Sequence, residues 1–158
     1  MYSNFSENVK ITSLFQGAAN AISCDVINME QFHHGAFVCI HTGSTDVDLV
    51  LSVYEATTVA AGTNRAIQVD VPLYVDTDMG TTSDTLIEQT AAKTYTINTT
   101  SAGDREQMVV FEVSADALSD TYPCCYLADS GGSASNIVSI FWLGEPRYKS
   151  KSLPSAIA

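Results

Sequence analysis

Charged residues are scarce in this chain, and basic ones are the scarcest. Asp, Glu, Lys and Arg make up only 16% of the 158 residues, and 18 acidic residues face 7 basic ones, so the formal net charge is −11. An acidic body of this kind repels phosphate groups, so we expect neither general nucleic-acid binding nor docking on anionic membranes. Thr, Ser and Ala are common instead, which favours strands, because Glu, Lys and Arg normally solvate helix faces.

Long apolar runs and targeting signals are also missing. No stretch approaches the roughly 20 apolar residues of a transmembrane helix. The first eight residues, MYSNFSEN, lack the basic-then-apolar order of a secretion signal, so we expect synthesis and initial use in the cytoplasm. Apolar residues nevertheless form 46% of the chain, which is enough for one domain with a substantial core.

The cysteines have no metal or redox spacing. There are four of them, and no two form a C-x-x-C pair, so neither a zinc motif nor a dithiol motif is predicted. Free cysteines commonly behave as small buried hydrophobic residues. We assign that role to Cys24, Cys39, Cys124 and Cys125.

Catalytic motifs are absent from the sequence as well. It has no G-x-S-x-G nucleophile elbow and no phosphate-binding loop, and the pair Asp76 and Asp78 lacks the spacing of a calcium loop. His33, His34 and His41, with Cys39 nearby, are also of metal-ligating type, and a turn that exposes His33 and His34 is the simpler interpretation. We therefore predict no catalytic residue, no cofactor and no metal site, and a non-enzymatic role. A metal-dependent enzyme around these histidines stays an alternative.

Short segments of alternating or continuous apolar character dominate the chain, with turn residues between them. One helical turn is expected at 114–118 with Ser114 as its cap, and Pro72 should confine its segment to an edge or a strand end. This cadence predicts an all-β fold, an antiparallel β-sandwich of jelly-roll type. The expected strands are 10–15, 21–27, 35–42, 48–55, 67–71, 85–90, 94–97, 107–113, 122–127 and 136–143. The expected core residues are Phe37, Val38, Ile40, Leu49, Leu51, Val53, Val109, Phe111, Ile140 and Trp142.

The domain organisation follows from this pattern. Residues 1–20 should be a partly irregular N-terminal segment, residues 21–144 the sandwich, and residues 145–158 an extended, basic C-terminal arm. The arm, EPRYKSKSLPSAIA, holds three of the seven basic residues, and its two prolines disfavour regular structure. We expect it to dock on a neighbouring subunit rather than on its own body. The candidate interface residues are Arg147, Tyr148, Lys149, Lys151, Leu153 and Ile157.

Three segments together resemble a known family. The first is DLVLSVYEA at 48–56, followed by AGTNRAI at 61–67. The second is MVVFEVSADAL at 108–118, and the third is the last strand with PRY at 146–148 and PSAI at 154–157. This pattern, spread over roughly residues 22–157, is similar to head-decoration, or cement, proteins of tailed bacteriophages.

The resemblance implies a β-rich protein that forms homotrimers on the outer surface of the capsid. It would clamp adjacent subunits of the major capsid protein, and it would be found in the virion after assembly in the host cytoplasm. The resemblance assigns no individual contact residue. A head-tail connector or tail structural protein would look similar in sequence. A carbohydrate-binding β-sandwich is a third alternative, for which a row of exposed aromatic residues is the expected feature.

Overall fold

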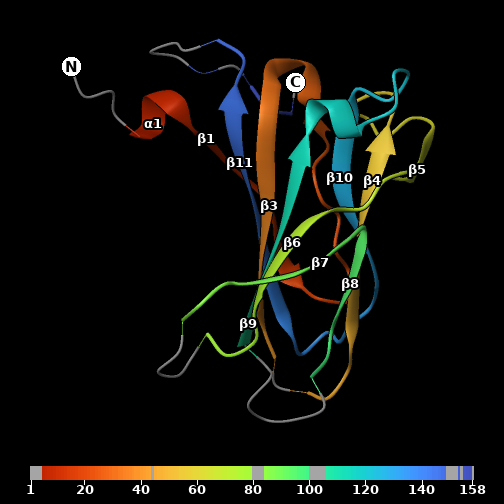
Figure 1. Cartoon of the computed structure of the whole chain (residues 1–158). Coiled ribbons are helices and arrows are strands. Elements are labelled where there is room, and N and C mark those ends of the chain that lie inside the picture. The colour runs from red at the N-terminus through yellow and green to blue at the C-terminus, as the bar shows by residue number, and fades with distance from the viewer. Residues whose placement is uncertain are drawn as a thin grey trace.

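The protein is a sandwich of two antiparallel sheets (Figure 1). The computed structural model describes residues 5–43, 45–79, 84–99, 106–148, 153 and 155–157. Among the described residues, helical structure consists of α1 (Phe5–Asn8) and the 3-10 turns η1 (Met29–Gln31) and η3 (Ala115–Ala117), and none of these helices could span a membrane. The strands are β1 (Lys10–Ala18), β2 (Ile27–Asn28), β3 (Phe32–Thr42), β4 (Leu49–Ala56), β5 (Asn64–Ala66), β6 (Val71–Asp76), β7 (Ile87–Ala92), β8 (Thr94–Ile97), β9 (Glu106–Ser114), β10 (Cys124–Gly131) and β11 (Ile137–Pro146).

The two sheets divide the strands unevenly. The larger sheet has the order β1-β11-β3-β9-β6-β7. The smaller has the order β2-β10-β4-β5, and β8 also pairs with β4. One edge of β4 pairs with β10 along its whole length, while β8 and β5 share the other edge, at Leu49–Ser52 and Tyr54–Ala56. The predicted all-β antiparallel sandwich is confirmed, and the jelly-roll connectivity stays a prediction.

Several predicted strand boundaries are wrong. The segment 67–71 is not a strand of its own: β5 ends at Ala66, residues 67–70 belong to no strand, and only Val71 enters one, as the first residue of β6. Pro72 is the second residue of β6 and so lies near the start of a strand instead of ending the predicted one, and the β6–β7 register shifts between Val71 and Leu73. The segment 21–27 contributes only its last residue to a strand. Residues 115–117 do form one turn, but Ser114 makes no capping hydrogen bond.

The core lies between the sheets and follows the strand alternation. Eight of the ten predicted core residues are buried. Val38 and Ile40 are the exceptions, because β3 turns Phe37 and Cys39 inward and therefore turns these two side chains outward. A segment that is apolar at every position gives no alternation from which to choose the inner face, so the sequence did not separate the two sets.

Trp142 occupies the centre of the larger sheet's inner face. Its indole lies over Gly35 and Gly144, and a Cβ atom at either glycine would overlap the ring. Phe32 and Phe37 pack beside it with ring centroids at 6.0 and 4.8 Å. The two facing glycines of β3 and β11 therefore make the space that the largest core side chain fills.

Candidate functional site

The predicted interface residues lie where β11 ends and the C-terminal segment begins. Arg147 and Tyr148 follow β11 directly, and Tyr148 is 82% exposed. Leu153 is half-buried beside Ser6, Val9 and Ile11, while Ile157 is 40% exposed. Lys149 and Lys151 lie outside the described residues.

The C-terminal segment was expected to dock on a neighbouring subunit, but Arg147 and Ala156 are bonded to the protein's own body. Its first residue is Arg147, whose backbone amide donates a hydrogen bond to the Gln31 carbonyl at 3.0 Å. Near its end, the Asn28 amide donates to the Ala156 carbonyl at 2.8 Å, and the Ala156 side chain is 1% exposed within the core. Arg147 and Ala156 are therefore both bonded to one short segment, 28–31. The expectation that the segment packs only on a neighbour is wrong, because its small apolar residue Ala156 fits a core position.

We call residues 147–156 the basic loop. It contains Arg147, Lys149 and Lys151, three of the seven basic residues of the chain. Both of its ends are fixed by backbone hydrogen bonds to the segment 28–31. β11 itself continues through Glu145 to Pro146, two residues beyond the expected end of the sandwich.

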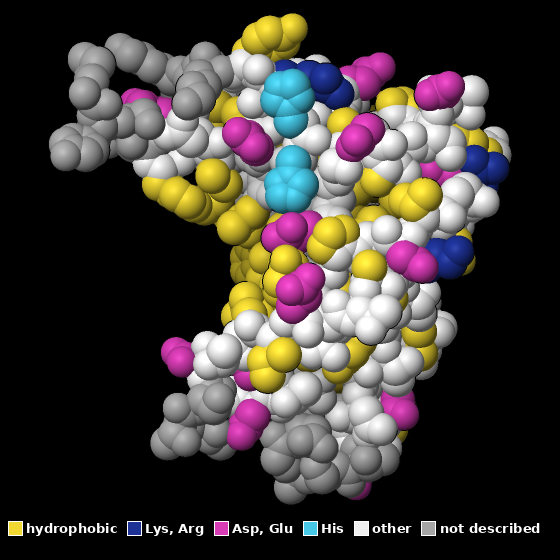
Figure 2. Space-filling view, viewed as in Figure 1, with side chains coloured by type: hydrophobic (Ala, Val, Ile, Leu, Met, Phe, Trp, Pro, Cys, Tyr) yellow, Lys and Arg dark blue, Asp and Glu magenta, His cyan; other side chains and the backbone are white. Residues whose placement is uncertain are grey.

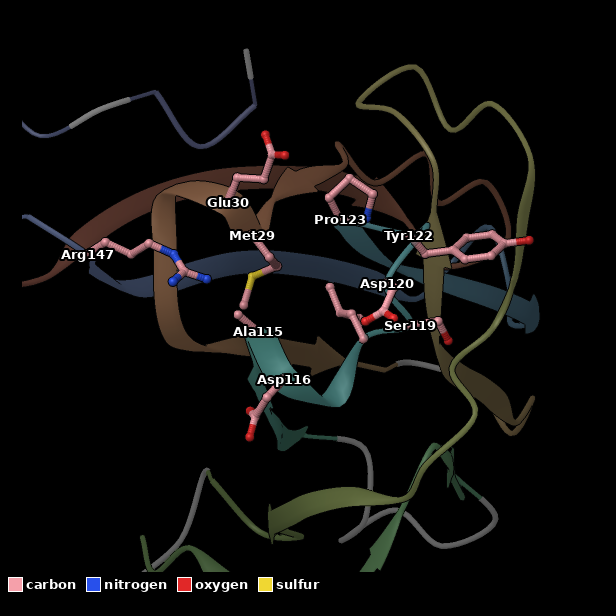
Figure 3. A pocket seen from close by; sticks show the side chains of 10 residues that line it. Met29, Glu30, Ala115, Asp116, Ser119, Asp120, Tyr122, Pro123 and Arg147 are labelled. Atoms are coloured by element: carbon pink, nitrogen blue, oxygen red, sulfur yellow. The ribbon is translucent and has the colours of Figure 1, made fainter.

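A pocket of about 370 Å³ opens beside the start of the basic loop. Figure 3 shows the Arg147 guanidinium reaching into it from one side and the Asp120 carboxylate from the other. Its apolar lining comes from Met29 and Pro123, and from the η3 region. The Glu30 and Asp116 carboxylates point away from the centre in Figure 3. The pocket is thus polar at its two walls and apolar between them.

An ion pair with one buried partner, Glu55, lies next to this pocket. Glu55, at the end of β4, is fully buried, and Arg65 of β5 donates from Nε to its Oε1 at 2.6 Å. Ser119 donates its backbone amide to Glu55 Oε2 at 3.0 Å and its hydroxyl to Oε1 at 2.9 Å. The Arg65 guanidinium also lies 4.4 Å from the centre of the Tyr122 ring. These contacts tie the β4–β5 hairpin to the 118–123 loop that lines the pocket.

The electrostatics of Glu55 follow from these partners. Burial alone would raise the pKa of this carboxyl group, but the hydrogen bonds from Ser119 and Arg65 outweigh burial and lower the pKa below its ordinary value. None of the sequence patterns above predicts this cluster. A usable signal existed, because Glu55 has the inward phase of Leu51 and Val53, and a carboxylate at a core position requires a charged or donating partner.

The histidines do not form the turn that was expected. His33 and His34 both lie in β3, and His34 Nε2 is 3.6 Å from Glu112 Oε2 of the adjacent strand. His41 is buried on the inner face of β3, the face it shares with Cys39. Within the described ranges, no three metal-ligating side chains come together.

All four cysteines are free thiols, and three of them are buried. Burial raises the pKa of Cys24 to about 12 and raises the pKa values of Cys39 and Cys125 as well. Thiols held in the protonated form are poor nucleophiles and poor metal ligands. This agrees with their assignment as small hydrophobic residues of the core.

Comparisons with known proteins do not assign this chain to a family. No protein-family model matches the chain, no curated protein matches it, and no solved structure matches it.

Proposed function

We propose that this protein is a non-enzymatic decoration, or cement, protein of a tailed-phage capsid. It binds the outer surface of the head and stabilises contacts between subunits of the major capsid protein. The observation that carries the proposal is the basic loop, which holds three of the seven basic residues of a strongly acidic chain and whose two ends are bonded to the protein's own body. The sequence resemblance to head-decoration proteins supports the same role.

A loop with fixed ends suits this task for entropic reasons. Association costs free energy when flexible side chains and loops become ordered, and a loop that is already tied to its own body has less freedom to lose. Arg147 and Tyr148 are of the residue types enriched at interface hot spots, and Tyr148 is largely exposed. A homotrimer, which we include in the proposal, presents three such loops and increases their effective concentration at the shell.

The test is co-sedimentation of the purified protein with mature shells that lack it. We expect saturable binding at copy numbers comparable with those of the capsid subunit. The double variant Arg147→Ala/Tyr148→Ala should bind more weakly, while Lys93→Ala removes one positive charge outside the loop and should bind like the wild type.

Other outcomes assign the protein elsewhere. Binding that saturates at a dozen copies or fewer would indicate a head-tail connector or a tail component. No binding at all would contradict the proposal.

A further inference from the structure

The outer face of the larger sheet is apolar at its centre. On β11, β3 and β9 the outward residues Phe141, Val38 and Val110 stand in register across neighbouring strands. The next strand, β6, adds Tyr74 opposite Val110. These side chains form one continuous row across four strands, on the face turned away from the smaller sheet.

The rows on either side extend this surface. One consists of Ile11, Leu143 and Ala36, and the other contains Ile40 and Met108. Ile11 is 55% exposed, Val110 is only 8% exposed, and the other side chains of these rows are half-buried. Figure 2 shows hydrophobic side chains lining a hollow in the left-hand outline, on the side of β1 and β11. We call this surface the outer apolar face.

The strands that build this face have the composition of strands covered on both sides. An antiparallel sheet with one wet face normally alternates apolar and polar residues, whereas a sheet covered on both faces has nearly continuous apolar runs. Residues 36–40, AFVCI, and 137–143, IVSIFWL, are runs of the second kind. The smaller sheet covers their inner side, and the outer side keeps accessible hydrophobic area that a partner can bury.

The charges around the face restrict what that partner is. Glu88, Glu106, Glu112 and Glu145 occupy outward positions toward its margins. On the described strands of this sheet, no outward position in the paired registers holds Lys or Arg. A second copy of the chain would bring the same carboxylates against these, on top of a net charge of −11 on each molecule. A complementary partner is apolar in the middle and carries basic groups at the edges.

We infer that the outer apolar face is the docking surface for a segment of the capsid subunit that is apolar at its centre and flanked by Lys or Arg. The inference rests on the proposed function for the source of this segment, the shell. It adds a second contact surface to the basic loop. The apolar centre supplies affinity by excluding water, and the acidic margin selects the partner and its orientation.

The experiment compares Val38→Lys with Val50→Lys in the co-sedimentation assay with shells. Val50 is the matched control, because it is also half-buried and points outward, but from β4 of the smaller sheet. We expect the wild type and Val50→Lys to bind alike and Val38→Lys to bind at least about tenfold more weakly. Thermal melting checks that both variants fold. If Val38→Lys does not fold, Val38→Thr keeps the branched shape while making the centre polar.

Salt dependence tests the charge argument separately. Binding of the wild type should weaken as salt is added, because the acidic margin meets basic groups. The double variant Glu88→Gln/Glu106→Gln should bind more weakly at low salt and show a smaller salt response. If shell binding by this variant depends on salt as strongly as binding by the wild type, the partner segment does not carry basic groups at its edges.

The outcomes separate the inference from the proposed function. Equal shell binding by wild type and Val38→Lys would overturn the docking surface and leave the decoration role intact. A wild type that does not bind shells overturns the decoration role itself, and with it the capsid subunit as partner. Self-association in sedimentation velocity that Val38→Lys abolishes and Val50→Lys retains would place a second copy on the face and overturn the inference.

Discussion

Arg65 reaches from β5 to the buried carboxylate of Glu55 on β4, and its Nε lies 2.6 Å from Oε1. The same guanidinium donates from its second terminal nitrogen to Ser119 Oγ at 2.9 Å and stacks over Tyr122. One side chain thus joins a hairpin of the smaller sheet to the loop that lines the pocket. Because Glu55 is fully buried, the loss of its partner should be costly.

Arg65→Ala should lower the free energy of unfolding by about 2 kcal/mol, within the range for hydrogen bonds to charged groups. The Arg65 side chain is 43% exposed, so solvent screens part of the ion pair, and the value lies below that of a fully buried pair. Urea unfolding measures the change. Arg65→Lys is the control, since it keeps the charge but loses the planar, stacked contact with Tyr122. Its free energy of unfolding should lie between those of the wild type and Arg65→Ala. An alanine variant as stable as the wild type would contradict the role of this pair.

The stability of the fold should depend on the ionisation of Glu55. The pKa of Glu55 is lower in the folded protein than in the unfolded chain, so its contribution is fully present above the unfolded-state pKa. That contribution is lost as the pH falls through the folded-state value. Urea unfolding of the wild type and Glu55→Gln over this acidic range should give a stability difference that shrinks toward low pH. A constant difference would mean that Glu55 is not the responsible group.

The attachment of the basic loop should depend on the small size of Ala156. Ala156→Leu overpacks a core position, a change that typically costs about 1–3 kcal/mol, and it should detach the end of the chain. Trypsin, which cuts after Lys and Arg, reports this as faster cleavage within the basic loop. Ser155→Leu is the control. Because Ser155 is exposed, this variant should be cleaved at the same rate as the wild type. Equal rates in all three proteins would show that Ala156 does not hold the loop.

The packing of the core should depend on the absence of a side chain at Gly144, where the Trp142 and Phe32 rings lie against the backbone. Gly144→Ala places a methyl group against the Trp142 indole nitrogen and the Phe32 ring, so it should lower the melting temperature and loosen the packing of Trp142. Tryptophan fluorescence follows this directly, since the chain has a single Trp. Gly17→Ala is the comparison, because its new Cβ would meet only the far end of the Phe15 ring, at 3.0 Å. A red-shifted emission maximum is expected for Gly144→Ala alone.

The sequence by itself determined the class of the fold and most of its core. Strict or continuous apolar patterns at 48–55, 107–113 and 136–143 indicate strands, and all seven predicted core side chains on these strands are buried where the strands face inward. Local pattern is sufficient here because a strand's alternation records which positions share a face.

Only the tertiary structure decided the rest. Which side of β3 is covered depends on where the second sheet lies, and the run AFVCI is equally apolar on both sides. The return of Ala156 to Asn28 and the binding of Ser119 to Glu55 join residues far apart in the chain. Such contacts arise when strands from distant segments pack into one sandwich. A pattern of residue types records the phase of each strand but not its partners, and the candidate functional surfaces of this protein are built from those partnerships.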